Sequence, residues 1–222
     1  MSLPIAGDGA NELGTARAHV APLSIISRLR AETRGEHDAV EQMLDLMNAS
    51  LNREGYRHRL QQFYGFYAPL EAALKFNSEH GADAARLNKT ALLHHDLQQL
   101  GGLIQNIPRC RDLPPLATRA EMTGCLYALE GATLSGRMIS QHARTTLGIT
   151  LTTGGSFFNG YGDDTGKMWQ SMRQLLLDCA VDTQTENSIV ATAIATLPAC
   201  AAGASQGRYE QRLTATKTTR HA

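Results

Sequence analysis

The stretch LRAETRGEHDAVEQML, residues 29–44, decides which fold this chain can adopt. The residues of one helical face recur in it at intervals of four, four, three and four: Leu29, Thr33, His37, Val40 and Leu44. The stretch therefore predicts a helix that carries a histidine on its apolar face. From position alone, a hydrogen-bonded core histidine is the more common structure, so the neighbours of His37 must decide its role.

Two polar neighbours favour a metal-binding role for His37. Glu41, one helical turn later, can accept a hydrogen bond from the ring N–H that is not used for the metal, which fixes the tautomer and raises the basicity of the ligand. Arg30 lies on nearly the same face, about 10.5 Å away at a rise of about 1.5 Å per residue. That separation is comparable to the reach from a haem iron to its propionates. One helix thus offers an iron ligand, its orienting partner and a carboxylate clamp.

A second unusual stretch, GCLYALEGATLSG at residues 124–136, lies inside the longest helical pattern of the chain. Each interior glycine costs a helix about 1 kcal/mol relative to alanine, so these glycines need a structural reason. Tyr127, Gly131 and Ser135 follow one another by about one turn, and only small groups lie below the tyrosine. A flat ligand could lie on the backbone there. Close packing against another helix explains the glycines equally well from this stretch alone.

The remaining helical patterns predict an all-α protein. No convincing alternation of apolar and polar residues indicates a strand, and no internal repeat is present. We expect a single-domain bundle of roughly six helices, with a flexible arm over residues 1–22, the helical domain over 23–200 and a polar tail over 201–222. The later helices are expected near 53–74, 88–100, 116–147, 163–180 and 183–197, with a glycine-rich loop over 152–161.

Composition excludes several classes of function. The 21 basic residues balance the 21 acidic residues, so the chain has no electrostatic footprint for nucleic acid or an anionic membrane. Residues 1–21 lack the pattern of a signal peptide, and no apolar run is long enough to span a bilayer. The four cysteines form no C-x-x-C pair, which argues against a zinc site or a redox dithiol. We therefore expect a reduced, cytoplasmic protein.

Two further motifs are weak. The stretch GYGDDTGK, residues 160–167, resembles a phosphate-binding loop, but Tyr161 stands at the first glycine position, Met168 follows the lysine, and two aspartates would repel phosphate. The stretch HHD, residues 94–96, resembles a metal-phosphohydrolase dipeptide, although a solvated helix face explains it more simply. No pair of Glu-x-x-His motifs supports a di-iron site.

Three separated stretches, in this order, resemble bacterial haem oxygenases. Residues 29–37 with Glu41 resemble the proximal helix of that family, and LYALEGATL, residues 126–134, resembles its distal helix. FFNGYG at 157–162, with TGKMW at 165–169, is most similar to the branch associated with bacteriophytochromes. The resemblance covers most of the expected helical domain, and the order of its motifs makes it specific.

The resemblance implies a haem-oxygenase-like bundle in which haem is sandwiched between a proximal helix and a kinked distal helix. His37 would be the proximal iron ligand, and Gly131 would let the distal helix approach the haem. Arg30, Tyr127 and Lys167 would hold or border the propionates. The implied catalytic residues are His37, Gly131, Ser135 and Gly136, and the implied haem-binding residues are Arg30, His37, Glu41, Tyr127, Gly131 and Lys167.

The chain departs from the family pattern in the distal helix and at its C-terminal end. Ser135 followed by Gly136 stands where the family usually has a second glycine, and Ala132 stands where some members have an aspartate. A hydroxyl at Ser135 could crowd the haem, join a distal water network, or bond back to the carbonyl four residues earlier. The segment 198–205 is small and polar where the family commonly continues an aromatic-bearing helix.

The activity that the resemblance implies is oxidative cleavage of haem at a meso carbon, with haem as both substrate and cofactor and O2 as the oxidant. Biliverdin, carbon monoxide and iron would be the products. Because the chain has no nucleotide-binding fingerprint, electrons would come from an external reductase or ferredoxin, and the bilin could pass to a bacteriophytochrome. Two alternatives stay open: a non-catalytic haem-binding or haem-sensing bundle in which Ser135 blocks turnover, and a thiaminase-like enzyme with Cys125 as its nucleophile.

Overall fold

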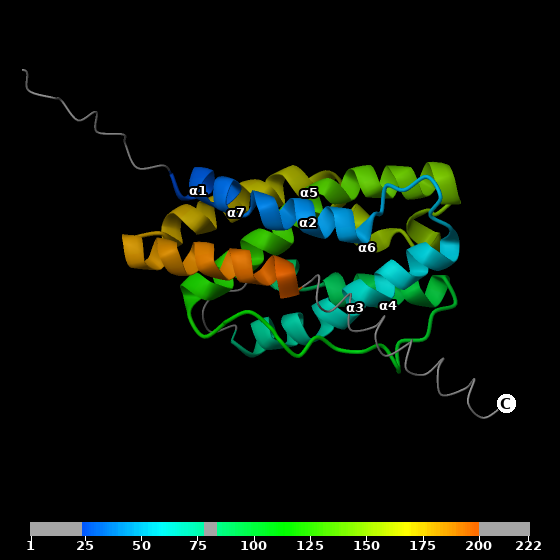
Figure 1. Ribbon diagram of the computed structural model, residues 1–222, viewed down its shortest axis with the longest axis horizontal. Coiled ribbons are helices and arrows are strands. Elements are labelled where there is room, and N and C mark those ends of the chain that lie inside the picture. The colour runs from blue at the N-terminus through cyan, green and yellow to red at the C-terminus, as the bar shows by residue number, and fades with distance from the viewer. Residues whose placement is uncertain (1–23, 78–83, 200–222) are drawn as a thin grey trace, which may run out of the picture.

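Helices joined by turns make up the described chain, which in the computed structural model comprises residues 24–77 and 84–199 (Figure 1). No strand occurs within these two ranges, so the prediction of an all-α domain is confirmed. The expected arm over 1–22 and tail over 201–222 lie outside the described residues. The helices are α1 (Ile25–Glu32), α2 (Arg34–Leu44), α3 (Arg53–Phe76), α4 (Lys89–Gln99), α5 (Arg119–Leu147), α6 (Ser156–Asn159), α7 (Thr165–Cys179) and a last helix over 183–199, with the 3₁₀ turns η2 (Ala84–Arg86), η3 (Leu151–Thr153) and η4 (Gly162–Asp164).

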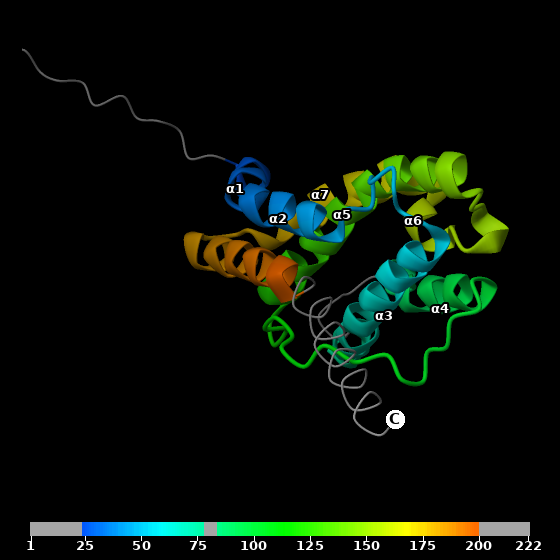
Figure 2. The same ribbon diagram turned by 45° about the vertical axis from the view of Figure 1, so that its right-hand side comes forward.

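The longest helix is α5, and local sequence fixes both of its ends. Its first turn carries a capping box, in which the Thr118 hydroxyl accepts from the Glu121 amide and the Glu121 carboxylate accepts from the Thr118 amide. It ends at Gly148, whose φ of 64° is a left-handed geometry that glycine adopts without strain. α5 packs against α6 and α7, whereas α3 lies beside α4 in both views (Figures 1 and 2). None of these helices combines the length and apolar character that crossing a membrane requires.

Two glycines within α5 are required by packing against neighbouring backbone. A Cβ on Gly124 would collide with the carbonyl oxygen of Ile189 in the last helix. A Cβ on Gly136 would lie 2.5 Å from the carbonyl oxygen of Phe158 in α6. Neither obstacle is a flexible side chain, so neither can move aside cheaply. Close helix packing therefore explains these two positions, and Gly131 is explained by the site described below.

The short helix α6 begins where a buried carboxylate from α4 meets its first amides. Asp96 is 0% exposed and accepts hydrogen bonds from the amides of Ser156, at 2.9 Å, and Phe157, at 2.7 Å. Burial raises the pKa of Asp96, and the two amide hydrogen bonds oppose that rise. The expectation of a solvated helix face over residues 94–96 is therefore wrong for Asp96. Sequence predicted only a loop at α6 because its capping residue lies 60 positions earlier.

α6 carries two phenylalanines into an aromatic cluster with α3. The ring centroid of Phe63 lies 5.1 Å from that of Phe157 and 5.6 Å from that of Phe158. Tyr67 lies 5.4 Å from Phe157 in an edge-on arrangement. Tilted and edge-on pairs at these separations are favourable beyond the area that they bury. Because Asp96 fixes α6, it also fixes this aromatic wall.

The expected first helix divides into α1 and α2 at Thr33. The Thr33 hydroxyl donates to the carbonyl four residues earlier at 2.8 Å, and the backbone there has a φ of −94° and a ψ of −4°. The two helices bury very different amounts of side chain. α1 buries Ile25 and Leu29, whereas α2, although longer, buries only Leu44. α2 therefore buries fewer side chains completely than α1, although its Val40 and Met43 also pack, partly buried, against the core.

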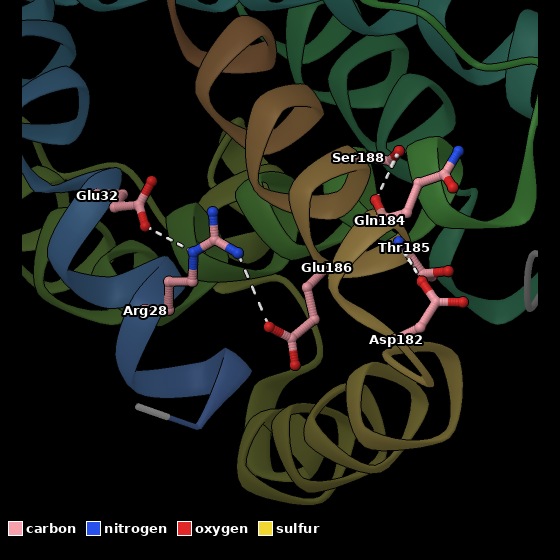
Figure 3. A network of polar contacts seen from close by, with 7 residues as sticks. All are labelled: Arg28, Glu32, Asp182, Gln184, Thr185, Glu186 and Ser188. Carbon is pink, nitrogen blue, oxygen red and sulfur yellow. Dashed lines mark hydrogen bonds and ion pairs between the residues drawn. The ribbon is translucent and has the colours of Figure 1, made fainter. Parts of the chain in front are cut away.

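A polar network joins α1 to the last helix (Figure 3). The guanidinium of Arg28 lies 2.7 Å from the carboxylate of Glu32 within α1 and 3.7 Å from that of Glu186 in the last helix. Partly exposed pairs of this kind contribute only about 0.2–1 kcal/mol each. Arg28 therefore sets where α1 lies against the last helix, while the burial of Ile25 and Leu29 supplies most of the attachment.

The last helix continues past the point where sequence predicted its end. It runs to residue 199 and so includes Pro198, which was expected to stop it at about 197. Proline removes one N–H donor, but in the final turn of a helix this costs a single hydrogen bond. The Cys110 thiol donates to the Ala199 carbonyl at 3.7 Å, so packing supports this turn.

We expect Gly124→Ala to destabilise the domain by about 1–3 kcal/mol, because the added methyl group would overlap the Ile189 carbonyl. The matched control is Gly166→Ala in α7, where nothing lies within 4 Å of the added Cβ and alanine favours the helix. Urea unfolding followed by circular dichroism measures both free energies. Equal stability of the two variants would contradict this account of the packing.

Candidate functional site

A cavity of about 360 Å³ lies between α2, α3, α5 and α6. Its volume is within the range of small-molecule binding sites. Its wall is largely apolar, and the aromatic cluster of α3 and α6 forms part of it. Its polar side chains include His37, Glu41, Lys89 and Ser135.

His37 extends from α2 toward α5. Its ring is half-buried, and its Cε1 and Nε2 atoms lie 3.5 and 3.7 Å from the position that a Cβ on Gly131 would take. Burial lowers the pKa of His37, and the charges of Glu41 and Asp38 oppose this only in part. The imidazole is therefore neutral at pH 7, which is the form that binds metals.

Glu41 does not make the hydrogen bond expected of it. It follows His37 by one turn and lines the cavity, but its side chain is exposed. Among residues 24–77 and 84–199, no hydrogen bond joins the two side chains, and Glu41 acts on His37 through charge alone. Water competes well for an exposed carboxylate, so this expected orienting bond is corrected to an electrostatic interaction.

The side of α5 that faces the cavity carries small residues beside the larger Leu129, Met138 and Ile139. Ala132, Ser135 and Gly136 line the cavity, and Gly131 faces the His37 ring directly. Gly131 is thus the glycine whose missing side chain leaves room beside the histidine, while Gly136 also serves the contact with α6. The Ser135 hydroxyl makes no hydrogen bond to any described residue, so it does not bond back within the helix. It is available to a molecule in the cavity.

Arg30 and Tyr127 come together beside α1. The phenol of Tyr127 hydrogen-bonds the side chain of Thr33, and its ring centroid lies 5.8 Å from that of Trp169. Burial raises the pKa of Tyr127, whereas the Thr33 bond and the charge of Arg30 oppose the rise. Neither Arg30 nor Tyr127 is in the cavity wall itself, although Ala128, the next residue after Tyr127, is.

Lys167 lies elsewhere than the resemblance implies. It is exposed in the first turn of α7 and lines an outer cleft together with Tyr161 and Asp164. No residue of that cleft lines the His37 cavity. All three residues that the resemblance assigns to the propionates thus lie outside the cavity wall, with Tyr127 close enough to Arg30 to be affected by its charge and Lys167 in a separate cleft.

Lys89 is a cavity residue that the sequence analysis missed. It is the first residue of α4, is 3% exposed, and lines the same cavity as His37. Nothing in the sequence distinguishes it, since lysines are almost always exposed and this one begins an ordinary helix. Only the packing of α4 against α3 and α6 buries it.

Cys125 does not fit the nucleophile of the thiaminase-like alternative. Its thiol is fully buried, is hydrogen-bonded with Thr196, and does not line the cavity. Burial raises its pKa to about 12, so the thiol stays protonated at neutral pH. A reactive cysteine needs both access and a lowered pKa, and this residue has neither.

Comparison with solved structures shows the same fold in several proteins. The chain is similar to the NO- and CO-bound heme oxygenase from Neisseria meningitidis, at 19% identity and a TM-score of 0.68, with 84% of this chain and 92% of that chain covered. For heme oxygenase from Leptospira interrogans the identity is 21%, the TM-score 0.67, and the coverage 83% and 100%. The chain is also similar to heme oxygenase-2 from Synechocystis sp. PCC 6803 in complex with heme and NO, at 20% identity and a TM-score of 0.63, with 82% of this chain and 84% of that chain covered.

Comparison by sequence extends this likeness from the fold to the family. No curated protein matches the chain. A protein-family model described as heme oxygenase matches residues 23–197, which is most of the sequence. That match includes the histidine helix, the glycine-bearing α5 and the segment around α6. The chain therefore belongs to the haem oxygenase family of enzymes.

Proposed function

We propose that this chain binds haem beside His37 and cleaves it oxidatively at a meso carbon, releasing biliverdin, carbon monoxide and iron. One observation carries the proposal: in a member of this family, a neutral histidine of α2 faces a glycine of α5 next to a largely apolar cavity. A histidine opposite bare helix backbone suits a flat macrocycle whose iron would be held by that histidine.

The attachment of α2 also fits the entry of a macrocycle. The His37 ring lies against Gly131, so a flat group passes between them only as α2 moves away from α5. α2 buries one residue, Leu44, and segments with few buried contacts open at low free energy. α1 stays attached through Arg28 and its buried side chains, so the turn at Thr33 separates a fixed helix from a movable one.

Each of these residues has a defined task in the proposed reaction. Bound haem would supply both the iron that activates O2 and the carbon that is oxidised. His37 would hold the iron through its neutral ring nitrogen. Gly131 and Ala132 carry no side chain long enough to fill the space beside the macrocycle, and the apolar wall excludes bulk water. Arg30 and Tyr127 would bind the propionates through charge and a phenolic hydroxyl.

We also propose a bilin acceptor, an electron donor and a cellular compartment for this enzyme. The similarity of residues 157–169 to the bacteriophytochrome-associated branch supports a role in supplying bilin to such a photoreceptor. We further propose an external reductase or ferredoxin as the electron donor and the cytoplasm as the compartment. Cys110, Cys125 and Cys179 are buried and form no disulfide with one another, as is usual for proteins of a reducing compartment.

The first test mixes the purified protein with haemin, records the absorption spectrum, and then adds ascorbate in air. We expect His37→Ala to lose the spectrum of histidine-ligated haem and to form no biliverdin, since the described cavity wall holds no second histidine. His95→Ala, at an exposed position of α4, is the matched control and should behave as the parent. An unchanged spectrum and turnover in His37→Ala would remove the assignment.

The second test concerns the orientation of the haem. We expect Arg30→Met to weaken haem binding by roughly tenfold, because a hydrogen bond to a charged group is lost, and Tyr127→Phe to weaken it less. Both variants should release mixed biliverdin isomers. Haem titration and chromatography of the products measure these effects, with exposed Arg144→Met as the control. Affinity and isomer pattern equal to the parent in both variants would count against propionate binding here.

The third test uses Ser135 to separate an enzyme from a non-catalytic haem binder. We expect Ser135→Gly to keep haem and remain active, with an altered affinity of the ferrous complex for carbon monoxide. Ser135→Leu should reduce haem affinity and biliverdin yield by roughly tenfold, because the larger side chain overfills the cavity. Leu134→Ala, at the exposed neighbouring position, is the control.

Two outcomes of that test would change the interpretation. Biliverdin formed by Ser135→Gly but not by the parent would favour the non-catalytic alternative, in which the serine blocks turnover. A Ser135→Leu variant indistinguishable from the parent would mean that Ser135 does not face the haem.

A further inference from the structure

A buried lysine lies in the wall of the cavity that His37 enters from α2. Lys89 begins α4, is 3% exposed and lines this cavity together with Thr133 of α5. Its ammonium lies 4.4 Å from the centroid of the Tyr161 ring. Within the described part of the chain, no carboxylate oxygen comes within 4.0 Å of this ammonium. Because an ammonium has three N–H donors, Lys89 has hydrogen-bonding capacity left for a molecule in the cavity.

Among the described residues, the carboxylates near Lys89 each lie close to another cation. Glu130 pairs with Arg86 at 3.2 Å, and Glu71 pairs with Lys75 at 3.8 Å, so each nearby carboxylate already has a cation of its own. Burial lowers the pKa of Lys89, while Glu130 and Glu71 oppose that change and favour the charged form. A buried charge without its own partner is costly. A cavity ligand with negative charge or free lone pairs would offset that cost.

The position of Lys89 is fixed by its surroundings. Its backbone amide donates to Glu71 Oε1 at 2.6 Å, which holds the start of α4 against α3. The Tyr161 hydroxyl donates to Glu130 Oε1 at 2.6 Å, which holds the aromatic ring next to the ammonium. A Cβ on Gly160 would lie 3.5 Å from the ammonium, so the lysine end is enclosed on that side as well. Such support lets a binding group act without first being ordered.

We propose that Lys89 is a ligand-binding residue of the haem cavity, whose ammonium hydrogen-bonds the small anion or oxygen-bearing ligand that occupies the cavity together with haem. The α5 side of the cavity carries hydroxyls, at Thr133 and Ser135, but no charged side chain, so Lys89 supplies the buried positive charge. This inference rests on the proposed function, since it requires haem to bind beside His37.

The test compares two probes on the ferric haem complex, sodium azide, which binds as an anion, and imidazole, which binds as a neutral molecule. We expect Lys89→Met to weaken azide binding about tenfold, as loss of a charged hydrogen bond requires, and to leave imidazole binding within about twofold. Lys89→Arg keeps the charge and should retain most of the azide affinity. Arg173→Met removes an exposed cation of α7 and should change neither titration.

Several outcomes would overturn the proposal. Equal loss of azide and imidazole affinity in Lys89→Met would mean that the lysine only supports the packing of the cavity. Loss of haem affinity with unchanged azide binding would make Lys89 a propionate-binding residue instead. If Lys89→Met does not fold, Lys89→Gln replaces it and should also bind azide about tenfold more weakly than the parent. A parent protein that takes up no haem would refute the proposed function, whereas haem uptake with an azide affinity unchanged in Lys89→Gln would refute the role of Lys89 alone.

Discussion

Close approach of other backbone to α5 is the constraint on which the rest of this structure depends. It is possible only where α5 has no side chain, at Gly124 against the last helix and at Gly136 against α6, while at Gly131 the missing side chain leaves room beside the ring of His37. Each glycine gives up about 1 kcal/mol of helix propensity. In return, the last helix and α6 lie closer to α5 than a side chain at Gly124 or Gly136 would permit. The walls of the cavity are placed by these contacts.

The two sides of the cavity differ in how firmly they are held. On one side, Asp96 caps α6 and fixes the aromatic residues that α6 packs against α3. Lys89 is fixed on the same side through Glu71 and the pair of Tyr161 with Glu130. On the other side, α2 carries His37 on a helix that buries only Leu44. Under the proposed function, the wall fixed by these contacts would recognise the ligand, and α2 would move to admit it.

Sequence predicted those parts of the structure that depend on nearby residues. The approximate bounds of α3, α4 and α5 were predicted because apolar spacing and the closing Gly148 are local, although α5 begins at Arg119, after its cap Thr118, and not at 116. α6 was missed because Asp96 reaches it from a distant helix. The division at Thr33 was missed because a threonine that bonds back to its own helix does not interrupt the apolar spacing.

Some residues of the candidate site could likewise be predicted from the sequence, and others could not. His37 and Gly131 could be predicted because each contradicts the usual preference of its position, a histidine on an apolar face and a glycine inside a helix. The role of Gly124 could not, since its partner, the backbone of residue 189, leaves no trace in the sequence. Lys89 could not either, because a surface lysine and a buried one look alike until the fold encloses them.

The sparse burial of α2 bears on the lifetime of the protein in a cell. A segment with one buried residue opens locally more often than helices such as α3 or α5, and proteases cleave open forms in proportion to their population. A ligand that bridges α2 to α5 lowers that population by mass action. The empty protein would then be degraded faster than the loaded one, and its abundance would follow the supply of its ligand without any change in synthesis.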